Sequence, residues 1–246
     1  MNKIYLILGG SSDIGCALLE RLNREQENSI FLVHYYSSDE KIKNILARNG
    51  NVIQTFQADL SKKEKVQELI SMIEQDYTAP THIVHLPANK FEYVKLKNYS
   101  EEALQKDMEV QVYSLLQILK AFLPKMIKGG QKAKVVAMLS SYTFSVPPKY
   151  MMNYIITKYA LLGLVKSLAS DYAGKNVCIN GISPSMVETK FLNGIDERII
   201  AMNAEKSAGK VNATPEQIVP AITFLLSAES DYITGINLNV SNGNNM

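Results

Sequence analysis

Short apolar runs alternate with longer amphipathic segments along the chain. The runs are rich in Ile, Val and Leu and end in Gly, Pro or polar residues, which is typical of buried parallel strands. The segments between them repeat apolar residues at helical spacing, as Val66, Leu69, Ile70 and Ile73 do. This alternation predicts an α/β fold with one doubly wound parallel sheet of about seven strands and helices on both faces. The predicted strands are residues 4–8, 29–35, 51–58, 81–86, 134–139, 177–183 and 236–240.

The segment 186–212 departs from this regular pattern. It is mixed in charge and weakly patterned, which in an enzyme is typical of a mobile lid over a site. There is no linker or repeat, so we expect residues 1–246 to form a single domain. A long helix is predicted to open at Ser100 and to end at the Gly129-Gly130 pair. The long helices are predicted at 62–76, 100–128 and 153–174.

A glycine-rich turn follows the first strand. It reads Gly9-Gly-Ser-Ser-Asp-Ile-Gly15, and apolar residues recur at helical spacing directly after it. Glycines let the backbone approach a pyrophosphate, and the helix amino terminus offers N–H groups and positive potential. The sequence therefore predicts a phosphate cradle, with a plain tight turn as the alternative.

The end of the second strand bears on cofactor choice. An Asp or Glu at that point would hold the ribose 2′-hydroxyl of NAD. Here Tyr36, Ser37 and Ser38 come first, Asp39 lies further on, and Lys41 is the nearest cation. The missing acid favours NADP over NAD, although no arginine is present for a 2′-phosphate.

Tyr154 and Lys158 stand four residues apart in a helical segment, which places both side chains on one face. An ammonium near a phenol lowers the phenol pKa and suits it to proton transfer. Ser141 lies thirteen residues before Tyr154, at the end of an apolar run. Its hydroxyl could hydrogen-bond the carbonyl group that the tyrosine protonates. A second pair with this spacing, Tyr93 and Lys97, has no such context, and we interpret it as a solvated surface pair.

Composition limits the other classes of function. The 246 residues are 46% hydrophobic with a net charge of +2 and no basic stripe, so nucleic acid is not an expected partner. No apolar run reaches the length of a signal peptide or membrane span, which indicates a cytoplasmic protein that does not enter a membrane. Cys16 and Cys178 are interpreted as buried thiols, and His34, His82 and His85 as structural residues rather than metal ligands.

Together, the glycine turn, Asp59, the Ser-Tyr-Lys set and the closing strand resemble the short-chain dehydrogenase/reductase family, and most of all its ketoacyl-carrier-protein reductase-like subgroup. The resemblance covers essentially the whole chain and implies a Rossmann-type fold. It implies an NAD(P)-dependent oxidoreductase that acts on a small-molecule carbonyl or secondary alcohol, a carrier-linked 3-oxoacyl group being one option. It also implies a homodimer or homotetramer formed through the two long helices.

The family's residue roles are carried over position by position. The resemblance gives Ser141, Tyr154 and Lys158 the catalytic roles, with Gln111 in place of the family's relay asparagine. It makes Tyr154 the proton donor and Lys158 the group that lowers its pKa and binds the ribose. The implied cofactor contacts are Gly9, Ser11, Ser12, Asp13, Ile14, Gly15, Tyr36, Ser37, Asp59, Leu60, Pro87, Ala88, Asn89, Tyr154, Lys158, Pro184, Val187 and Thr189.

Several positions depart from the family pattern. Asp13 replaces the middle glycine of the turn, and a carboxylate there repels a pyrophosphate, so we expect Asp13 to cap the following helix. The segment Leu86-Pro-Ala-Asn89 replaces Asn-Asn-Ala-Gly, and Pro87 has no N–H to donate. Pro184-Ser185 replaces Pro-Gly.

Two functions therefore remain open. One is the oxidoreductase, and the other is a relative that binds a dinucleotide or a partner without turnover. The substrate is not readable from the sequence. Four methionines, Met151, Met152, Met186 and Met202, suggest an adaptable apolar pocket or ordinary core.

Overall fold

The computed structural model describes residues 2–244 and contains one seven-stranded, fully parallel sheet. The strand order is β3-β2-β1-β4-β5-β6-β7, which confirms the predicted α/β fold with a doubly wound sheet. The strands are β1 Ile4–Leu8, β2 Ile30–Tyr35, β3 Val52–Gln57, β4 His82–His85, β5 Ala133–Met138, β6 Val177–Pro184 and β7 Asn237–Val240.

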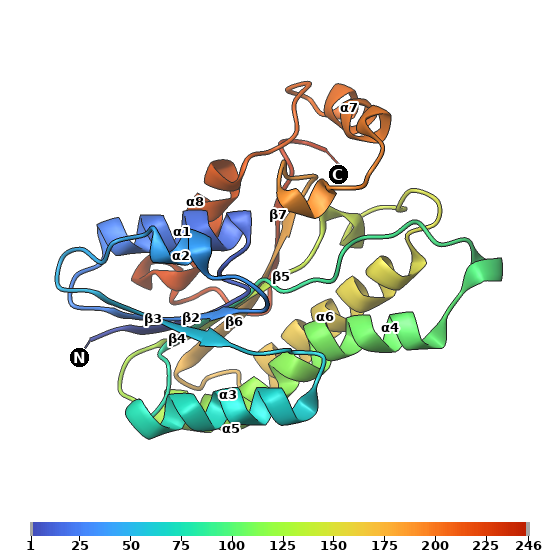
Figure 1. The fold of residues 1–246 in the computed structure, drawn as a ribbon. Helices are drawn as coiled ribbons and strands as arrows, with labels where there is room; N and C mark the ends of the chain where they lie inside the picture. The colour runs from blue at the N-terminus through green and yellow to red at the C-terminus, as the bar shows by residue number, and fades with distance from the viewer. Residues whose placement is uncertain (1, 245–246) are drawn as a thin grey trace.

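Helices cover both faces of the sheet (Figure 1). Successive β1 side chains point to opposite faces, so Leu6 and Leu8 join one core cluster while Tyr5 and Ile7 join the other. Both faces are buried, which explains why the strands read as continuous apolar runs. One face carries α1 Asp13–Glu25, α2 Glu40–Lys43 and α8 Pro215–Leu226, and the other carries α3 Lys63–Asp76, α4 Glu101–Met108, α5 Ser114–Lys128 and α6 Met152–Asp171.

The strand order reverses at β1, which pairs with β2 on one side and with β4 on the other. In open parallel sheets, ligands bind in the crevice outside the carboxyl ends of the strands at such a switch point. The glycine-rich turn leaves β1 at this place, and the segment 86–89 leaves β4 beside it.

The predicted long helix between Ser100 and the Gly129-Gly130 pair is present, with a π-helical segment inside it. Ser100 caps its start, because the Ala103 N–H donates to Ser100 Oγ at 3.2 Å. Between α4 and α5 the chain winds into a π-helical segment, Glu109–Tyr113. Such segments are rare inside α-helices and are found frequently at functional sites.

The segment 186–212 holds a 3₁₀ turn, Lys190–Leu192, and α7, Glu197–Lys206, which buries none of its residues. Figure 1 shows α7 standing clear of the sheet on the side where the glycine-rich turn lies. Both ends of the segment are fastened together: Glu188 N donates to Ala213 O at 2.8 Å, and Ala213 N donates to Met186 O at 3.0 Å. Movement of the segment as a lid stays a prediction.

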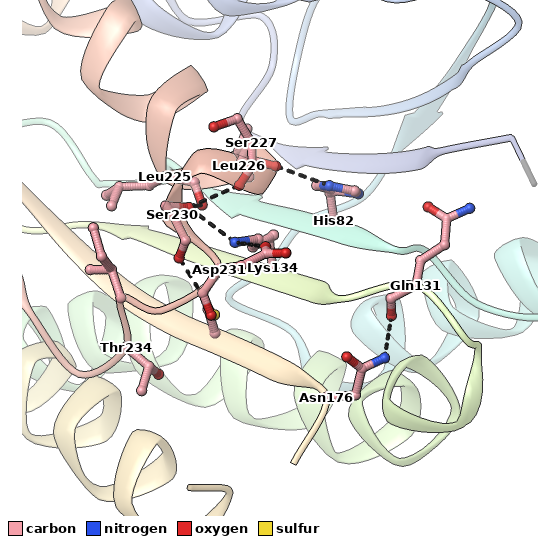
Figure 2. Close-up of polar contacts among 12 residues, drawn as sticks. His82, Gln131, Lys134, Asn176, Leu225, Leu226, Ser227, Ser230, Asp231 and Thr234 are labelled. Atoms are coloured by element: carbon pink, nitrogen blue, oxygen red, sulfur yellow. Dashed lines mark hydrogen bonds and ion pairs between the residues drawn. The ribbon is translucent and has the colours of Figure 1, made fainter. Parts of the chain in front are cut away.

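A buried polar cluster lies at the opposite ends of the strands (Figure 2). Lys134 of β5 donates to Ser230 Oγ at 3.0 Å and pairs with Asp231 Oδ1 at 2.7 Å. His82 Nε2 lies 3.1 Å from Leu226 O. These contacts attach β4 and β5 to the connection between α8 and β7, so they are part of the scaffold.

The interpretation of the three histidines as structural stays a prediction. His34, His82 and His85 are buried in strands, and burial lowers the pKa of each, to about 3 for His82 and His85. Within residues 2–244 no group of His, Cys, Asp and Glu has the arrangement of a metal site. None of the helices in this part of the chain has the length and apolar composition needed to cross a bilayer. Cys178 is buried as expected, but Cys16 is only half-buried.

Candidate active site

A cavity of about 460 Å³ opens at the carboxyl ends of the strands and extends from the glycine-rich turn to α6. Most of the residues singled out in the sequence line it, while Gly15, Ser37 and Gln111 do not. Those that line it are Gly9, Ser11, Ser12, Asp13, Ile14, Tyr36, Asp59, Leu60, Pro87, Ala88, Asn89, Ser141, Tyr154, Lys158, Pro184, Val187 and Thr189.

Glycines shape the turn at one end of this cavity. Gly9 has a φ of +73°, and a Cβ on Gly15 would lie 2.7 Å from the backbone of Gly10. A Cβ on Gly10 would lie 2.3 Å from Val33 Cγ1. Gly15 therefore acts through close packing of α1 on the turn, although it does not line the cavity.

The cap of α1 is Ser12, which corrects the expectation for Asp13. Ser12 has an extended backbone, with φ −67° and ψ 161°, and its Oγ accepts from Gly15 N at 3.1 Å. Asp13 is the first residue of the helix instead. Its carboxylate forms an ion pair with Lys41 Nζ and accepts from Lys190 N at 2.6 Å. Partial burial acts to raise the pKa of Asp13, but the bonds and charges of Lys41 and Lys190 bring that pKa below its usual value.

Next to the turn lie the residues expected at the adenosine. Tyr36 is 62% exposed and lines the cavity. Asp59 accepts from Ser61 N at 3.0 Å and from Ser61 Oγ at 2.7 Å. Partial burial raises the pKa of Asp59, but these bonds outweigh it and the pKa is lowered. Asp39 pairs with Lys43 at 3.0 Å and lies outside the cavity lining, so no acid from the end of β2 enters the site.

Tyr154 and Lys158 lie at the other end of the cavity, one turn apart on α6. Burial raises the pKa of Tyr154 to about 12, and a hydrogen bond with the Ser140 side chain partly opposes this effect. Burial lowers the pKa of Lys158 to about 7, partly offset by the charge of Asp107. Lys158 Nζ donates to Met138 O at 2.9 Å and lies 5.5 Å from the centre of the Tyr154 ring. The expected lowering of the Tyr154 pKa by Lys158 is therefore not the dominant effect in this structure.

Ser140 was missed by sequence reasoning. The spacing pointed to its neighbour Ser141, which is also buried and lines the cavity at the start of a short 3₁₀ turn, Ser141–Thr143. The hydroxyl that bonds to Tyr154 belongs to Ser140. The adjacent Ser-Ser pair was the signal that both hydroxyls were candidates.

Gln111 is buried in the π-helical segment, and its Oε1 has no hydrogen-bond partner. A buried acceptor without a partner is costly. The structure does not bring this side chain into the cavity lining, and its role stays a prediction.

Asp107 is a second residue that the sequence did not indicate. Its Oδ1 accepts from Asn89 Nδ2 at 2.7 Å, and burial raises its pKa despite this bond and the charge of Lys158. Asn89 follows β4 and Asp107 lies on α4, so only the folded chain brings them together. Pro87 packs beside Gly9: a Cβ on Gly9 would lie 3.2 Å from Pro87 N.

Aromatic rings surround Tyr154. Phe91 meets it edge to face with ring centres 5.5 Å apart, and Phe191 lies 6.4 Å away. Tyr93 is exposed, as expected of a surface residue, but it also packs against Phe91 at 4.7 Å and lines the cavity. Of the four methionines noted in the sequence, the cavity is lined by Met151 and Met186. The wall around the phenol is therefore largely apolar.

The shape and donors of the cavity fit a pyridine dinucleotide. The positive φ of Gly9 and the close packing at Gly15 shape the turn, and the first turn of α1 offers N–H groups of the kind that bind a pyrophosphate. Tyr36 and Asp59, expected at the adenosine, and Tyr154 and Lys158, expected at the nicotinamide end, all line this cavity. Asp13 opposes an anion at the turn.

A family model described as Enoyl-(Acyl carrier protein) reductase matches residues 9–245. Glucose 1-dehydrogenase 2 of Bacillus subtilis is 28% identical over 98% of this chain and 94% of its own length. The 3-oxoacyl-[acyl-carrier-protein] reductase FabG of Vibrio cholerae is 26% identical over 98% of this chain and 97% of its own length.

Solved structures share the fold. A short-chain dehydrogenase/reductase from Serratia marcescens superposes with a TM-score of 0.89 at 20% identity, covering 99% of this chain and 98% of its own. A 4-hydroxyisoleucine dehydrogenase complexed with NADH has a TM-score of 0.86 at 22% identity, and the superposition covers 98% of both chains.

Proposed function

The chain belongs to the short-chain dehydrogenase/reductase family and is an NAD(P)-dependent oxidoreductase, and from this premise we propose that it transfers a hydride between nicotinamide and a carbonyl or secondary alcohol by a Ser-Tyr-Lys mechanism. One observation carries the proposal. The Tyr154 phenol bonds to a serine hydroxyl, with Lys158 one turn away, at the inner end of a cavity that begins at a glycine-rich turn.

The bound nicotinamide would supply or accept the hydride. Tyr154 holds the proton that a developing alkoxide takes up, and its raised pKa keeps the phenol protonated. The serine hydroxyl orients the carbonyl oxygen and stabilises the charge that forms on it. A protonated phenol is a donor, so the site is arranged for carbonyl reduction.

Lys158 has two tasks in this proposal. It fixes the end of β5 through Met138 O, and it offers further N–H donors toward the ribose hydroxyls. An anionic cofactor entering the cavity raises the Lys158 pKa, because a nearby negative charge favours the ammonium. In the proposed complex the charged Lys158 then offsets part of the effect of burial on the Tyr154 pKa.

NADP is the favoured cofactor. Asp39 is held by Lys43 outside the cavity lining, so the acid that follows β2 is not available to a 2′-hydroxyl, and Lys41, which lines the cavity, is a candidate cation for a 2′-phosphate. The aromatic wall formed by Phe91 and Phe191 favours a substrate with an apolar part, and a carrier-linked 3-oxoacyl group is one such substrate.

A homodimer or homotetramer is supported by exposed apolar residues on the two long helices. Leu116 of α5 and Ile156 and Tyr159 of α6 are all exposed. Pairing through these helices would bury them. The sedimentation coefficient of the purified protein tests this, because a monomer at micromolar concentration would contradict the pairing.

The second function, dinucleotide binding without turnover, is favoured by Asp13 alone. One experiment separates the two. Purified protein is titrated with NADPH and NADH by nicotinamide fluorescence, and turnover is measured on a panel of carbonyls. Tyr154→Phe should abolish turnover and keep cofactor binding, while Tyr159→Phe, an exposed tyrosine on the same helix, should keep both.

Each other outcome is informative. If the wild type binds a cofactor and Tyr154→Phe turns over carbonyls as fast as the wild type, the proposed mechanism is overturned. Binding without turnover on any carbonyl supports the second function. No binding of either cofactor at millimolar concentration overturns the oxidoreductase proposal.

A further inference from the structure

Asp13 connects three segments that are far apart in the sequence. Its Oδ1 pairs with Lys41 Nζ, from α2 beyond the end of β2. Its Oδ2 accepts from the backbone N–H of Lys190 at 2.6 Å, at the start of the segment that precedes α7. All three residues line the same cavity. Both carboxylate oxygens are therefore engaged inside the cofactor site.

The partners of Asp13 are the kind that bind phosphate. A backbone N–H group and a lysine ammonium beside a helix amino terminus form a ready site for an anion. Here the chain's own carboxylate takes those donors. It is ionised, because the bonds from Lys41 and Lys190 outweigh its partial burial and lower its pKa.

Lys41 matters for the choice between the two cofactors. NADPH differs from NADH only by a 2′-phosphate, and a cation beyond the end of β2 is what such a phosphate needs. The other acids nearby are engaged elsewhere: Asp39 pairs with Lys43, and Asp59 accepts from Ser61. Within residues 2–244, Lys41 forms its ion pair with Asp13.

We propose that Asp13 is a specificity-determining residue that engages Lys41 and so lowers the preference of this chain for NADPH over NADH. The proposal rests on the proposed function, because it concerns how the same site binds its cofactor. An entering NADPH must displace the Asp13 carboxylate from Lys41 and from Lys190 N–H before its phosphates can use them. NADH also meets an Asp13 carboxylate that occupies donors for the pyrophosphate, which both cofactors contain. It has no 2′-phosphate, however, and so has no need of Lys41.

The test compares Asp13→Asn, Lys41→Gln and the double variant. Asparagine keeps the size of the side chain and an oxygen that can accept from Lys190 N–H, but removes the charge. Kd values for NADPH and NADH are measured by nicotinamide fluorescence at fixed ionic strength. The ratio of the two Kd values should shift toward NADPH by roughly fivefold in Asp13→Asn, a modest factor because the pair is partly exposed. The shift should be absent when Lys41→Gln is also present.

Asp39→Asn is the matched control. It removes a carboxylate from the same connection after β2, but one that pairs with Lys43 and does not line the cavity, so the ratio should stay unchanged. Circular dichroism and thermal melting confirm that each variant folds, and Asp13→Ser replaces Asp13→Asn if the latter does not.

The outcomes distinguish this inference from the function on which it rests. Equal tightening of both cofactors, an unchanged ratio or weaker NADPH binding in Asp13→Asn overturns the role of Asp13 in specificity while leaving the oxidoreductase intact. A shift that survives Lys41→Gln also overturns it. Failure of the wild type and every variant to bind either cofactor is instead the failure of the proposed function.

Discussion

Ser140 forms a side-chain hydrogen bond with Tyr154, and this bond partly opposes burial, which raises the phenol pKa to about 12. We therefore expect Ser140→Ala to raise the pKa of Tyr154 further and to lower kcat by about 100-fold, as removal of an oxyanion donor does. The measurements are the alkaline limb of the kcat profile and an ultraviolet titration of the phenol.

Ser141→Ala is the matched control for this prediction. Ser141 is the next residue, is equally buried and lines the same cavity. Because Ser140 is the serine whose hydrogen bond lowers the Tyr154 pKa, replacement of Ser141 should shift the Tyr154 titration less than Ser140→Ala does. A shifted phenol titration in Ser141→Ala, with none in Ser140→Ala, would show that Ser141 and not Ser140 bonds to Tyr154.

The contrast between these two serines shows where sequence patterns stop being informative. Counting thirteen residues back from Tyr154 identifies the right turn after β5, but it cannot say which of two adjacent hydroxyls faces the ring. The fold itself was predictable, because strands buried on both faces must be apolar along their whole length. The glycine turn was predictable because Gly9 needs a positive φ and Gly15 a close approach.

Other features depend on contacts that no local pattern contains. Asp13 was expected to cap α1, but a cap residue needs an extended backbone, and that conformation falls on Ser12. The carboxylate was then free to reach Lys41 and Lys190, which only the folded chain brings near. α7 was missed because it buries no residue, and without a buried face a helix has no apolar stripe to detect.

Lys158 gives the protein a stability that depends on pH. Burial lowers its pKa from 10.5 to about 7 in the folded chain. Below about pH 7 both folded and unfolded chains carry the proton, and the folded chain bears the full cost of a buried charge. Between pH 7 and 10.5 only the unfolded chain binds the proton, so this group makes the free energy of unfolding rise with pH.

We therefore expect the free energy of unfolding of Lys158→Met, relative to that of the wild type, to be highest at low pH. The free energy of unfolding of the wild type, minus that of the variant, should increase from about pH 6 to about pH 9 in urea titrations. Lys166→Met, at an exposed position of the same helix, is the control and should give a flat difference. A difference that stays flat from about pH 6 to about pH 9 would mean that Lys158 keeps its proton in the folded chain.

The Asn89–Asp107 pair tunes the same lysine. The charge of Asp107 raises the pKa of Lys158, against the larger effect of burial. Asp107→Asn removes that charge, so the Lys158 pKa should fall and the pH at which kcat/KM declines should move lower. Asn89→Gly removes the 2.7 Å bond that lowers the Asp107 pKa, so it should move the profile in the same direction by less.

Glu109→Gln is the control for this pair. Glu109 follows Asp107 by two residues and accepts from Gln105 at 3.1 Å on the exposed side of the helix. Its replacement should leave the pH profile where it is. An unmoved profile in Asp107→Asn would show that this carboxyl does not act on Lys158 during turnover.

At the opposite end of the sheet, Lys134 and Asp231 form a pair whose two members are not equivalent. The Lys134 side chain is 2% exposed and that of Asp231 is 47% exposed. Asp231→Ala leaves a buried ammonium with Ser230 as its remaining partner in Figure 2, and should lower the free energy of unfolding by about 2 kcal/mol. Lys134→Met removes the buried charge itself and leaves Asp231 in water, so it should cost less, about 1 kcal/mol.

Urea denaturation measures both losses, with Glu229→Ala at an exposed neighbouring position as the control. The order of the two losses is decisive, because a larger loss in Lys134→Met would mean that the ammonium is held mainly by Ser230 and by packing rather than by Asp231.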